Sequence, residues 1–432
     1  MSTSDAVAIF AEGTFEDQIL EMAGYISQSR PEPERAPYVQ SIKQTLAVKP
    51  GQTPLSEDLQ RRRVVFADVL GDVKGLGEGS EREIEGFFNL LYAHLLTLWP
   101  IDSPETKKRL SDLLPIITSS PVESATTTKY RVLSNLFNTL PRQSALRLPV
   151  YSALLGLASS SDELHVLQLS RDDVQKWLKD WEITPAEKSA FLKVLAEVFS
   201  NAGQPDTAYH YKLAHVRSLD PASQSAQLAA LDAIATALAN PAVFDFDPLF
   251  KLAAVVAARS HPLFSLLQIF LNGGLDELHT WQRAHANVSS TFGLDSAQLE
   301  HKIRLLALAD LGFQNIGQDL SYAQVAAALQ VPRSEVERWV IDGIRAGLLT
   351  GKLAQPAQTL RVTRATARAF GPQEWALLVK RLAGWRGGLA GVLDVVAAAR
   401  RRNDAVTTAV APGERQPETP GEAEVAAVET NG

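Results

Sequence analysis

The sequence contains no cysteine and only two methionines among its 432 residues. The absence of cysteine excludes disulfides, thiolate zinc sites, iron–sulfur clusters and cysteine nucleophiles, and it fits a reducing compartment. The N-terminal segment lacks a basic stretch followed by an apolar core. No uninterrupted apolar run approaches the roughly 18 residues that a membrane span requires. We therefore expect a soluble protein of the cytoplasm or nucleus, with no membrane as a partner.

Motifs for catalysis and for metal binding are also missing. His210 and His215 are five residues apart and His279 and His285 are six apart, so neither pair shares a helical face on which to hold a metal. No His-Glu-x-x-His or Gly-x-Ser-x-Gly motif occurs. The glycine-rich stretch at 71–81 has no Gly-Lys-Ser/Thr, which predicts a loop between helices rather than a phosphate-binding loop. These absences predict a protein that is not an enzyme and uses no cofactor or metal.

Acidic charge is concentrated at the C-terminal end of the chain. Residues 403–432 carry six acidic residues and one arginine, a net charge of −5 out of −7 for the whole chain. The remainder is nearly neutral, so no overall field attracts a polyanion or an anionic membrane. The same segment is rich in alanine, proline, glutamate and threonine, which predicts a disordered acidic tail over 403–432.

Helical periodicity dominates from about residue 81 to about residue 310. The clearest unit is a helical hairpin at 184–218, where Thr184 and Glu187 are spaced as a capping box and NAGQPD separates the two helices. Such hairpins bury their apolar faces only by stacking on one another. This pattern predicts a mainly α protein with a right-handed TPR- or HEAT-like arch, while RPEPERAP at 30–37 indicates a loop.

A winged helix is predicted after the hairpins, over 311–372. LSYAQVAAALQV supplies a short helix that Ser321 can cap, and RSEVERWVIDGIRAGLLTGKLAQPAQTLRV supplies a second helix, a glycine exit and two strands. Ser334 and Glu337 have capping-box spacing. Leu360 and Val362 alternate with polar residues, as in a half-buried strand.

Two candidate surfaces follow from this winged helix. At 100° per residue, one face of the second helix carries both charge signs. This mixture disfavours binding in the major groove of DNA and leaves two alternatives, a surface for a partner or a solvated face. The residues of this face are Glu335, Arg338, Trp339, Asp342 and Arg345. Residues 301–402 have a net charge of +8, from 15 basic and seven acidic residues. This excess indicates either phosphate contacts with RNA or the ribosome, or a basic rim that pairs with acidic subunits, the slightly favoured alternative. The candidate contacts are Lys352, Arg361, Arg364 and Arg368.

The segment 373–402 is predicted to be one amphipathic helix. Apolar residues recur at spacings of three and four, and a terminal helix cannot bury such a stripe within its own domain. The alternative is that it packs back on the chain's own helices. The stripe comprises Leu378, Leu382, Trp385, Leu389, Val392 and Val396, with Trp375 preceding it.

The order of hairpins, winged helix and terminal helix resembles the PCI module, which is found in the proteasome lid, the COP9 signalosome and eukaryotic translation initiation factor 3. Three stretches are similar to the subunit M family of that initiation factor, of the fungal type: LEHKIRLLALADLG, VERWVIDGIRAGLLTGKLAQPAQTLRV and RAFGPQEWALLVKRLAGWRGGL. The resemblance covers roughly 180–395 and implies a helical-repeat region at 1–200 and a PCI module at 201–372, made of hairpins at 201–310 and the winged helix.

This resemblance also implies a function. It predicts a cytoplasmic, ribosome-associated scaffold that binds other initiation factor 3 subunits through the winged helix and a C-terminal helix bundle. Through that complex it supports assembly of the 43S preinitiation complex and recruitment of mRNA and initiator tRNA to the 40S subunit. The COP9 signalosome subunit 7 family, which shares the Val-Ile-Asp and wing pattern but not the Phe-Gly…Trp helix, and an RNA-binding adaptor remain alternatives.

Overall fold

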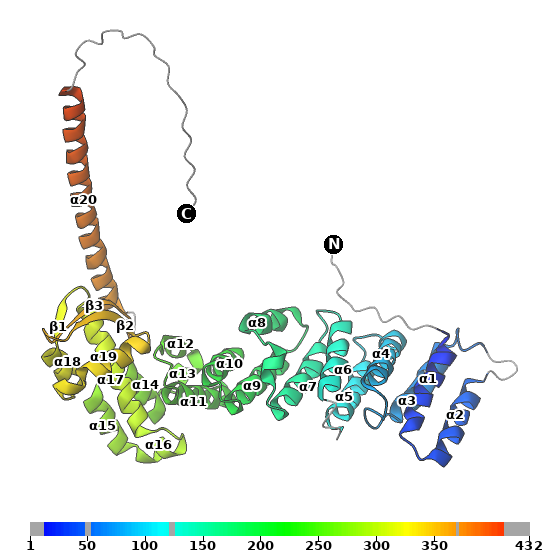
Figure 1. Ribbon diagram of the computed structural model, residues 1–432. Coiled ribbons are helices and arrows are strands. Elements are labelled where there is room, and N and C mark those ends of the chain that lie inside the picture. Colours follow the sequence, from blue (N-terminus) through cyan, green and yellow to red (C-terminus); the bar gives the residue numbers. More distant parts are fainter. Residues whose placement is uncertain (1–12, 48–52, 121–125, 369–370, 410–432) are drawn as a thin grey trace, which may run out of the picture.

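The computed structural model describes residues 13–47, 53–120, 126–368 and 371–409. Most of these residues are helical, and one small sheet lies near the C-terminal end. Figure 1 shows the helices arranged in an extended row, with α1 at one end, the sheet at the other and the long α20 rising from the sheet end. The predicted mainly α architecture is confirmed. The part of the predicted tail after Ala409 lies outside the described residues.

The first part of the row consists of helices that pack on the next helix or the next but one in the chain, as α1 packs on α2 and α4 on α6. They are α1 (Phe15–Gln28), α2 (Glu32–Leu46), α3 (Leu59–Gly71), α4 (Glu81–Leu98), α5 (Pro104–Thr118), α6 (Thr126–Thr139), α7 (Arg147–Ser160), α8 (Arg171–Asp180), α9 (Pro185–Asn201) and α10 (Pro205–Ser218), with a 3-10 turn η2 (Leu164–Leu167). The predicted hairpin is α9 and α10. Its capping box is present, because the Thr184 hydroxyl accepts from the Glu187 amide at 3.2 Å and the Glu187 carboxylate accepts from the Thr184 amide at 3.0 Å.

One expectation for the N-terminal part is wrong. The segment 30–37 is not a loop, because α2 begins at Glu32. Pro33 stands in the first turn of α2, where its missing N–H would have had no helical partner. Pro37 lies inside the helix, where it removes one backbone hydrogen bond. Burial of Tyr38, Ile42 and Leu46 on one face of α2 stabilises the helix against that loss.

A second hydrophobic core begins at α10 and extends to α17. Its helices are α11 (Gln224–Ala239), α12 (Asp247–Phe250), α13 (Ala253–Ala257), α14 (Pro262–Asn272), α15 (Leu275–Ala284), α16 (Ala286–Thr291) and α17 (Ser296–Gln314). α10 joins the two cores, since Tyr211 packs in the first and Leu213 in the second. Buried Lys302 of α17 donates to the carbonyls of Ala237 and Asn240, at 2.6 Å each, at the end of α11.

The winged helix has the predicted order of elements. They are β1 (Asp319–Ser321), α18 (Tyr322–Leu329), a 3-10 turn η3 (Arg333–Glu335), α19 (Val336–Arg345), β2 (Leu349–Ala354) and β3 (Thr359–Ala365). The sheet order is β1-β3-β2, with both strand pairs antiparallel. Ser321 caps α18, Gly347 has a φ of +73°, and Leu360 and Val362 are fully buried, as predicted. Strand β1 was not predicted, because three residues are too few to show a period of two.

The predicted capping box at Ser334 is wrong. Ser334 lies inside η3, and α19 begins two residues later without a side-chain cap. The Glu337 carboxylate instead accepts from the Tyr322 hydroxyl at 3.2 Å and from the Gln355 side-chain amide at 3.3 Å. Those contacts tie α19 to the start of α18 and to the wing turn.

The C-terminal helix α20 (Pro372–Ala409) is the longest element. It extends beyond the predicted end at 402, so residues 403–409, which were expected to be disordered, are helical. At 1.5 Å per residue, its 38 residues span about 57 Å. In Figure 1 it projects away from the row of helices.

Candidate protein-interaction surfaces

The α19 face carries both charge signs around a tryptophan. Trp339 is half-buried, and its ring centre lies 4.9 Å from that of His301 on α17. Asp342 lies 3.9 Å from the imidazole of His301 and 4.0 Å from the guanidinium of Arg345. Arg338 is exposed. These four predicted residues therefore share one accessible face.

Glu335 departs from the predicted arrangement. It is exposed but lies in η3 rather than on α19. Of the two predicted acids, Asp342 is therefore the one that lies on α19 itself. Its charge contacts are long and partly exposed, so they contribute little to stability and leave the face free to form new ones. Its role as a partner interface remains a prediction.

Three of the four predicted RNA-contact cations lie exposed on the wing. Lys352 on β2 is directly opposite Arg361 on β3, and Arg364 is opposite Thr350. Like charges opposite one another in a sheet destabilise it. The Asp319 carboxylate, 4.0 Å from Arg361, offsets only part of that repulsion. The wing therefore presents a small positive patch.

Arg368 does not belong to that patch. Its guanidinium donates to the carbonyl of Gly273, before α15, at 2.7 Å, and burial lowers its pKa. This arginine fixes the segment that leads into α20 against the helical region. The structure thus assigns it a structural contact in place of the predicted exposed position.

Helix α20 leaves its apolar side chains in solvent. Trp385 is 76% exposed and Leu389 63%, and every side chain from Leu382 to Arg402 is classed as exposed. Within the described parts of the chain, α20 is attached at its base: the Arg381 guanidinium donates to the carbonyl of Phe313 and lies 4.8 Å from the centre of its ring. The alternative that α20 packs back on the chain's own helices is therefore not what the described residues adopt.

The exposed apolar surface of α20 is wider than the predicted stripe. Leu378, which is half-buried, Leu382, Trp385 and Leu389 follow one side as predicted, with Trp375 beside them. At 100° per residue, however, Val379 and Val395 lie about 100° to either side of that line, and both are more than 60% exposed. A helix that is apolar on more than one side requires more than one packing partner.

Four glycines lie on the side of α20 away from the stripe. A Cβ atom added at any of them would meet nothing within 4 Å. Glycine inside a helix destabilises it by about 0.5–1 kcal/mol relative to alanine. No close packing against the described residues compensates for this loss of helix stability, because the space beside each glycine is open. Small residues do allow another helix to approach closely. They are Gly384, Gly387, Gly388 and Gly391.

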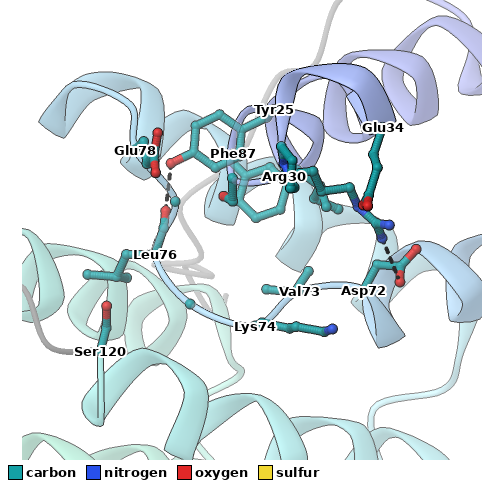
Figure 2. Close-up of a pocket in the computed structure, with 15 residues that line it drawn as sticks. Tyr25, Arg30, Glu34, Asp72, Val73, Lys74, Leu76, Glu78, Phe87 and Ser120 are labelled. Carbon is teal, nitrogen blue, oxygen red and sulfur yellow. Dashed lines mark hydrogen bonds and ion pairs between the residues drawn. The ribbon is translucent and has the colours of Figure 1, made fainter. Parts of the chain in front are cut away.

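The glycine-rich stretch predicted to be a loop forms one wall of a pocket of about 470 Å³ near the N-terminal end (Figure 2). The Tyr25 hydroxyl donates to the carbonyl of Leu76 at 2.6 Å, and Arg30 pairs with Asp72 at 3.1 Å. A Cβ at Gly77 would lie 2.6 Å from the Tyr25 hydroxyl, so glycine is required there. Both charge signs line this pocket, which does not favour a phosphate.

Among the described residues, no three histidine or acidic side chains gather as a metal site. Residues Glu374–Arg402 of α20 are long and apolar enough, by length and composition, to cross a membrane. Energetics argue against it: residues 382–399 hold six leucines and valines, worth about −2 to −4 kcal/mol on insertion. Arg386 and Asp394 near the centre cost about 5–7 kcal/mol together. Other helices are therefore the better environment.

Comparisons with known proteins match both parts of the C-terminal half. The PCI domain family model matches residues 282–364, and the model described as "eIF3 subunit M, C-terminal helix" matches 368–396. Subunit M of eukaryotic translation initiation factor 3 from Phaeosphaeria nodorum is 34% identical over 406 residues, which are 91% of this chain and 89% of the relative. The chain belongs to the family of eukaryotic translation initiation factor 3 subunit M.

Other members of the subunit M family show the same coverage. The Aspergillus oryzae protein is 31% identical over 91% of this chain and 87% of its own length, and the Aspergillus terreus protein is 32% identical over 92% and 88%. The resemblance inferred from the three quoted stretches is confirmed, and the signalosome alternative is not the family found. The family model of the subunit M C-terminal helix matches the chain from Arg368 to Val396, which includes the apolar part of α20.

Proposed function

We propose that this chain is a non-catalytic scaffold subunit of the cytoplasmic initiation factor 3 complex. In this proposal α20 enters a bundle with helices of other subunits, and the α19 face contacts a neighbouring subunit. Through that complex the chain supports assembly of the 43S preinitiation complex and recruitment of mRNA and initiator tRNA to the 40S subunit. The observation that carries the proposal is the exposed apolar surface of α20.

The magnitude of that surface is sufficient to drive association. Nine large apolar side chains from Trp375 to Val396 are 45–76% exposed. Full burial of such a side chain is worth about 1.5–3 kcal/mol, so covering the exposed part of each gives roughly 10 kcal/mol in total. The four glycines oppose this by about 2–4 kcal/mol. The balance favours a helix that is packed among partners, before the entropy of association is counted.

The experiment replaces three stripe residues by aspartate: Leu382, Trp385 and Leu389. The other subunits of the complex should then fail to co-purify with the chain. The control places aspartate at Ala383 and Ala390, which are also exposed but lie on another side of α20, and should retain more of the partners. A chain ending at Gly371 should fold and also lose them. Intact assembly after the truncation would refute the bundle.

The exposed cations of the wing favour a second, narrower role in RNA contact. Lys352 and Arg361 present adjacent positive charge, and among the described residues Asp319 is the one carboxylate that forms an ion pair with either of them. Phosphate attraction of this kind weakens steeply as salt increases. Changing both cations to glutamate should reduce RNA binding by the full chain at low salt, measured by filter binding. Unchanged RNA binding would exclude the wing as the contact.

A further inference from the structure

A basic pocket lies in the arch, remote from α19 and α20. Helices α8, α9 and α10 enclose a cavity of about 340 Å³. Its apolar lining comes from Val174 and Leu178 of α8, Leu192 of α9 and Ala214 of α10. Val174, Leu178 and Leu192 are buried, so they form an apolar floor to which both α8 and α9 contribute.

The charged residues that line this pocket are all cationic. Lys179, Lys188 and Arg217 come from the three different helices, and no carboxylate lines the cavity. Within the parts of the chain that the structure describes, none of these three cations has an ion pair. Arg217 and Lys179 are exposed, and Lys188 is half-buried.

Other lysines on the same hairpin are paired. Lys193 of α9 lies 3.8 Å from Glu197, and Lys212 of α10 lies 2.7 Å from Asp232. The other two lysines of the hairpin thus each have a carboxylate partner, Glu197 of α9 and Asp232 of α11, whereas Lys188 and Arg217 at the pocket have no such ion pair among the described residues. In a region of nearly neutral overall charge, a local group of unpaired cations is a specific feature of the surface rather than a consequence of composition.

Two further polar groups line the pocket, and one of them, His210, is influenced by the positive charge. Burial lowers the pKa of His210, and the neighbouring guanidinium groups of Arg171 and Arg217 lower it further. Tyr211 also lines the pocket, and its buried hydroxyl has no hydrogen-bond partner among the described residues. Burial raises the pKa of this tyrosine to about 12, so it keeps its proton at neutral pH and remains a donor.

We propose that this pocket binds an acidic peptide segment of a partner protein, with an apolar side chain on the floor and carboxylates against Lys188 and Arg217. The cations of the pocket require acidic residues in the peptide, and the apolar floor requires an apolar side chain between them. A nucleic acid backbone has no group for such a floor. The Tyr211 side chain is only 2% exposed and its ring already packs on Phe199, 5.5 Å between centres, so it offers no open face on which a base could stack.

The chain's own acidic tail fits the pocket less well than a partner does. Residues 410–432 carry five glutamates. They follow α20, which is about 57 Å long and directed away from the row of helices (Figure 1). A tail in the same molecule has to cross that length again before it reaches α8–α10.

The test uses the full chain and fluorescein-labelled peptides of twelve residues, measured by anisotropy. The first peptide carries glutamates around one leucine in a glycine–serine context. The second replaces the leucine by serine, the third replaces the glutamates by lysines, and oligouridylate serves as the nucleic acid probe. The first peptide should bind most tightly, severalfold more tightly than the second. Tighter binding of oligouridylate at this pocket, or equal binding of all peptides, overturns the proposal.

Charge reversal locates the site. The double variant Lys188→Glu, Arg217→Glu should bind the acidic peptide at least about tenfold more weakly and should gain affinity for the lysine peptide, a result that misfolding cannot produce. The control, Lys193→Glu with Lys251→Glu, changes net charge equally at exposed positions outside the pocket and should leave the affinity for the acidic peptide within about twofold. Unchanged binding in the pocket variant overturns the assignment.

Two truncations separate this proposal from the others. A chain ending at Ala409 should bind the acidic peptide as the full chain does. Much tighter binding by that truncated chain would show that the tail occupies the pocket and would overturn the assignment to a partner. A chain ending at Gly371 should retain peptide binding even though it loses α20, so the outcome is independent of the proposed helix bundle.

Discussion

Lys302 offers the sharpest test of how the helical row is joined to the winged helix. It is 3% exposed, and its ammonium donates to three carbonyls at the C-terminal end of α11: those of Ala237 and Asn240 at 2.6 Å and that of Leu238 at 3.4 Å. The rings of Phe244 and Phe246 lie 5.7 and 5.1 Å from Nζ. Because α17 also packs on α18, α19 and β3, this lysine links α11 to the winged helix.

Replacing Lys302 by methionine keeps the volume and removes the donors. A hydrogen bond to a charged group contributes about 1.5–3 kcal/mol net, so the two short bonds account for about 3–6 kcal/mol. Relief from burying the ammonium, whose pKa burial lowers to about 7, opposes this loss, so the lower end of that range applies. The carbonyl ends of α11 also lose a cation that favours the negative end of the helix dipole. We expect the variant to be destabilised by about 3 kcal/mol or more.

Hydrogen–deuterium exchange measures this effect where it arises. In the Lys302→Met variant, amides in α11 and α17 should exchange at least about a hundredfold faster, since each 1.4 kcal/mol of opening free energy is worth about tenfold. Amides in α1–α4 should be unchanged. The control Lys193→Met removes an exposed cation whose pair with Glu197 is 3.8 Å long, and such a pair contributes at most about 1 kcal/mol. Exchange in Lys302→Met that matches the control would refute the reasoning.

Three further predictions concern pH and glycine. Burial lowers the pKa of Lys302 to about 7. Between about pH 7 and 10 the unfolded chain therefore binds one more proton than the folded chain, so the free energy of unfolding should rise with pH. Urea unfolding should show this rise in the native chain but not in Lys302→Met. Gly347→Ala should lower stability by about 1 kcal/mol in the same assay, because φ is +73° and nothing crowds the site; an unchanged midpoint would contradict this. Alanine at Gly384, Gly387, Gly388 and Gly391 should increase the helicity of an isolated α20 peptide yet weaken subunit co-purification.

Local signals in the sequence predicted local structure well, and failures occurred where a distant residue intervened. The predicted capping box at Thr184 and the predicted cap at Ser321 formed, because each needs only residues within one turn. The same spacing at Ser334 failed, since Glu337 is engaged by Tyr322 and by Gln355 of the wing. No pattern within the helix itself indicates those two partners.

The candidate sites show the same division. Lys352, Arg361 and Arg364 are exposed as predicted, whereas Arg368 is engaged by the carbonyl of Gly273, 95 residues earlier in the chain. A count of charged residues includes Arg368 but cannot show that its guanidinium is hydrogen-bonded to a distant carbonyl. Lys302 escaped notice for the same reason, because a lysine within an apolar helical pattern is ordinarily assigned to the solvent side. The pocket between α8 and α10 required three helices to be placed before its cations could be seen together.

The two attachments of the C-terminal segment explain how a rigid row and a partner-dependent helix coexist in one chain. Arg368 holds the segment before α20 to the helical region, and Arg381 holds the base of α20 to Phe313 at the end of α17. Beyond Arg381 no side chain up to Arg402 is buried by the described residues. The chain's own contacts therefore fix where α20 starts, and none of the described residues covers its glycine-rich middle. In the proposed complex, such a subunit fixes the position of the base of α20, and the neighbouring subunits determine the direction of the helix beyond it.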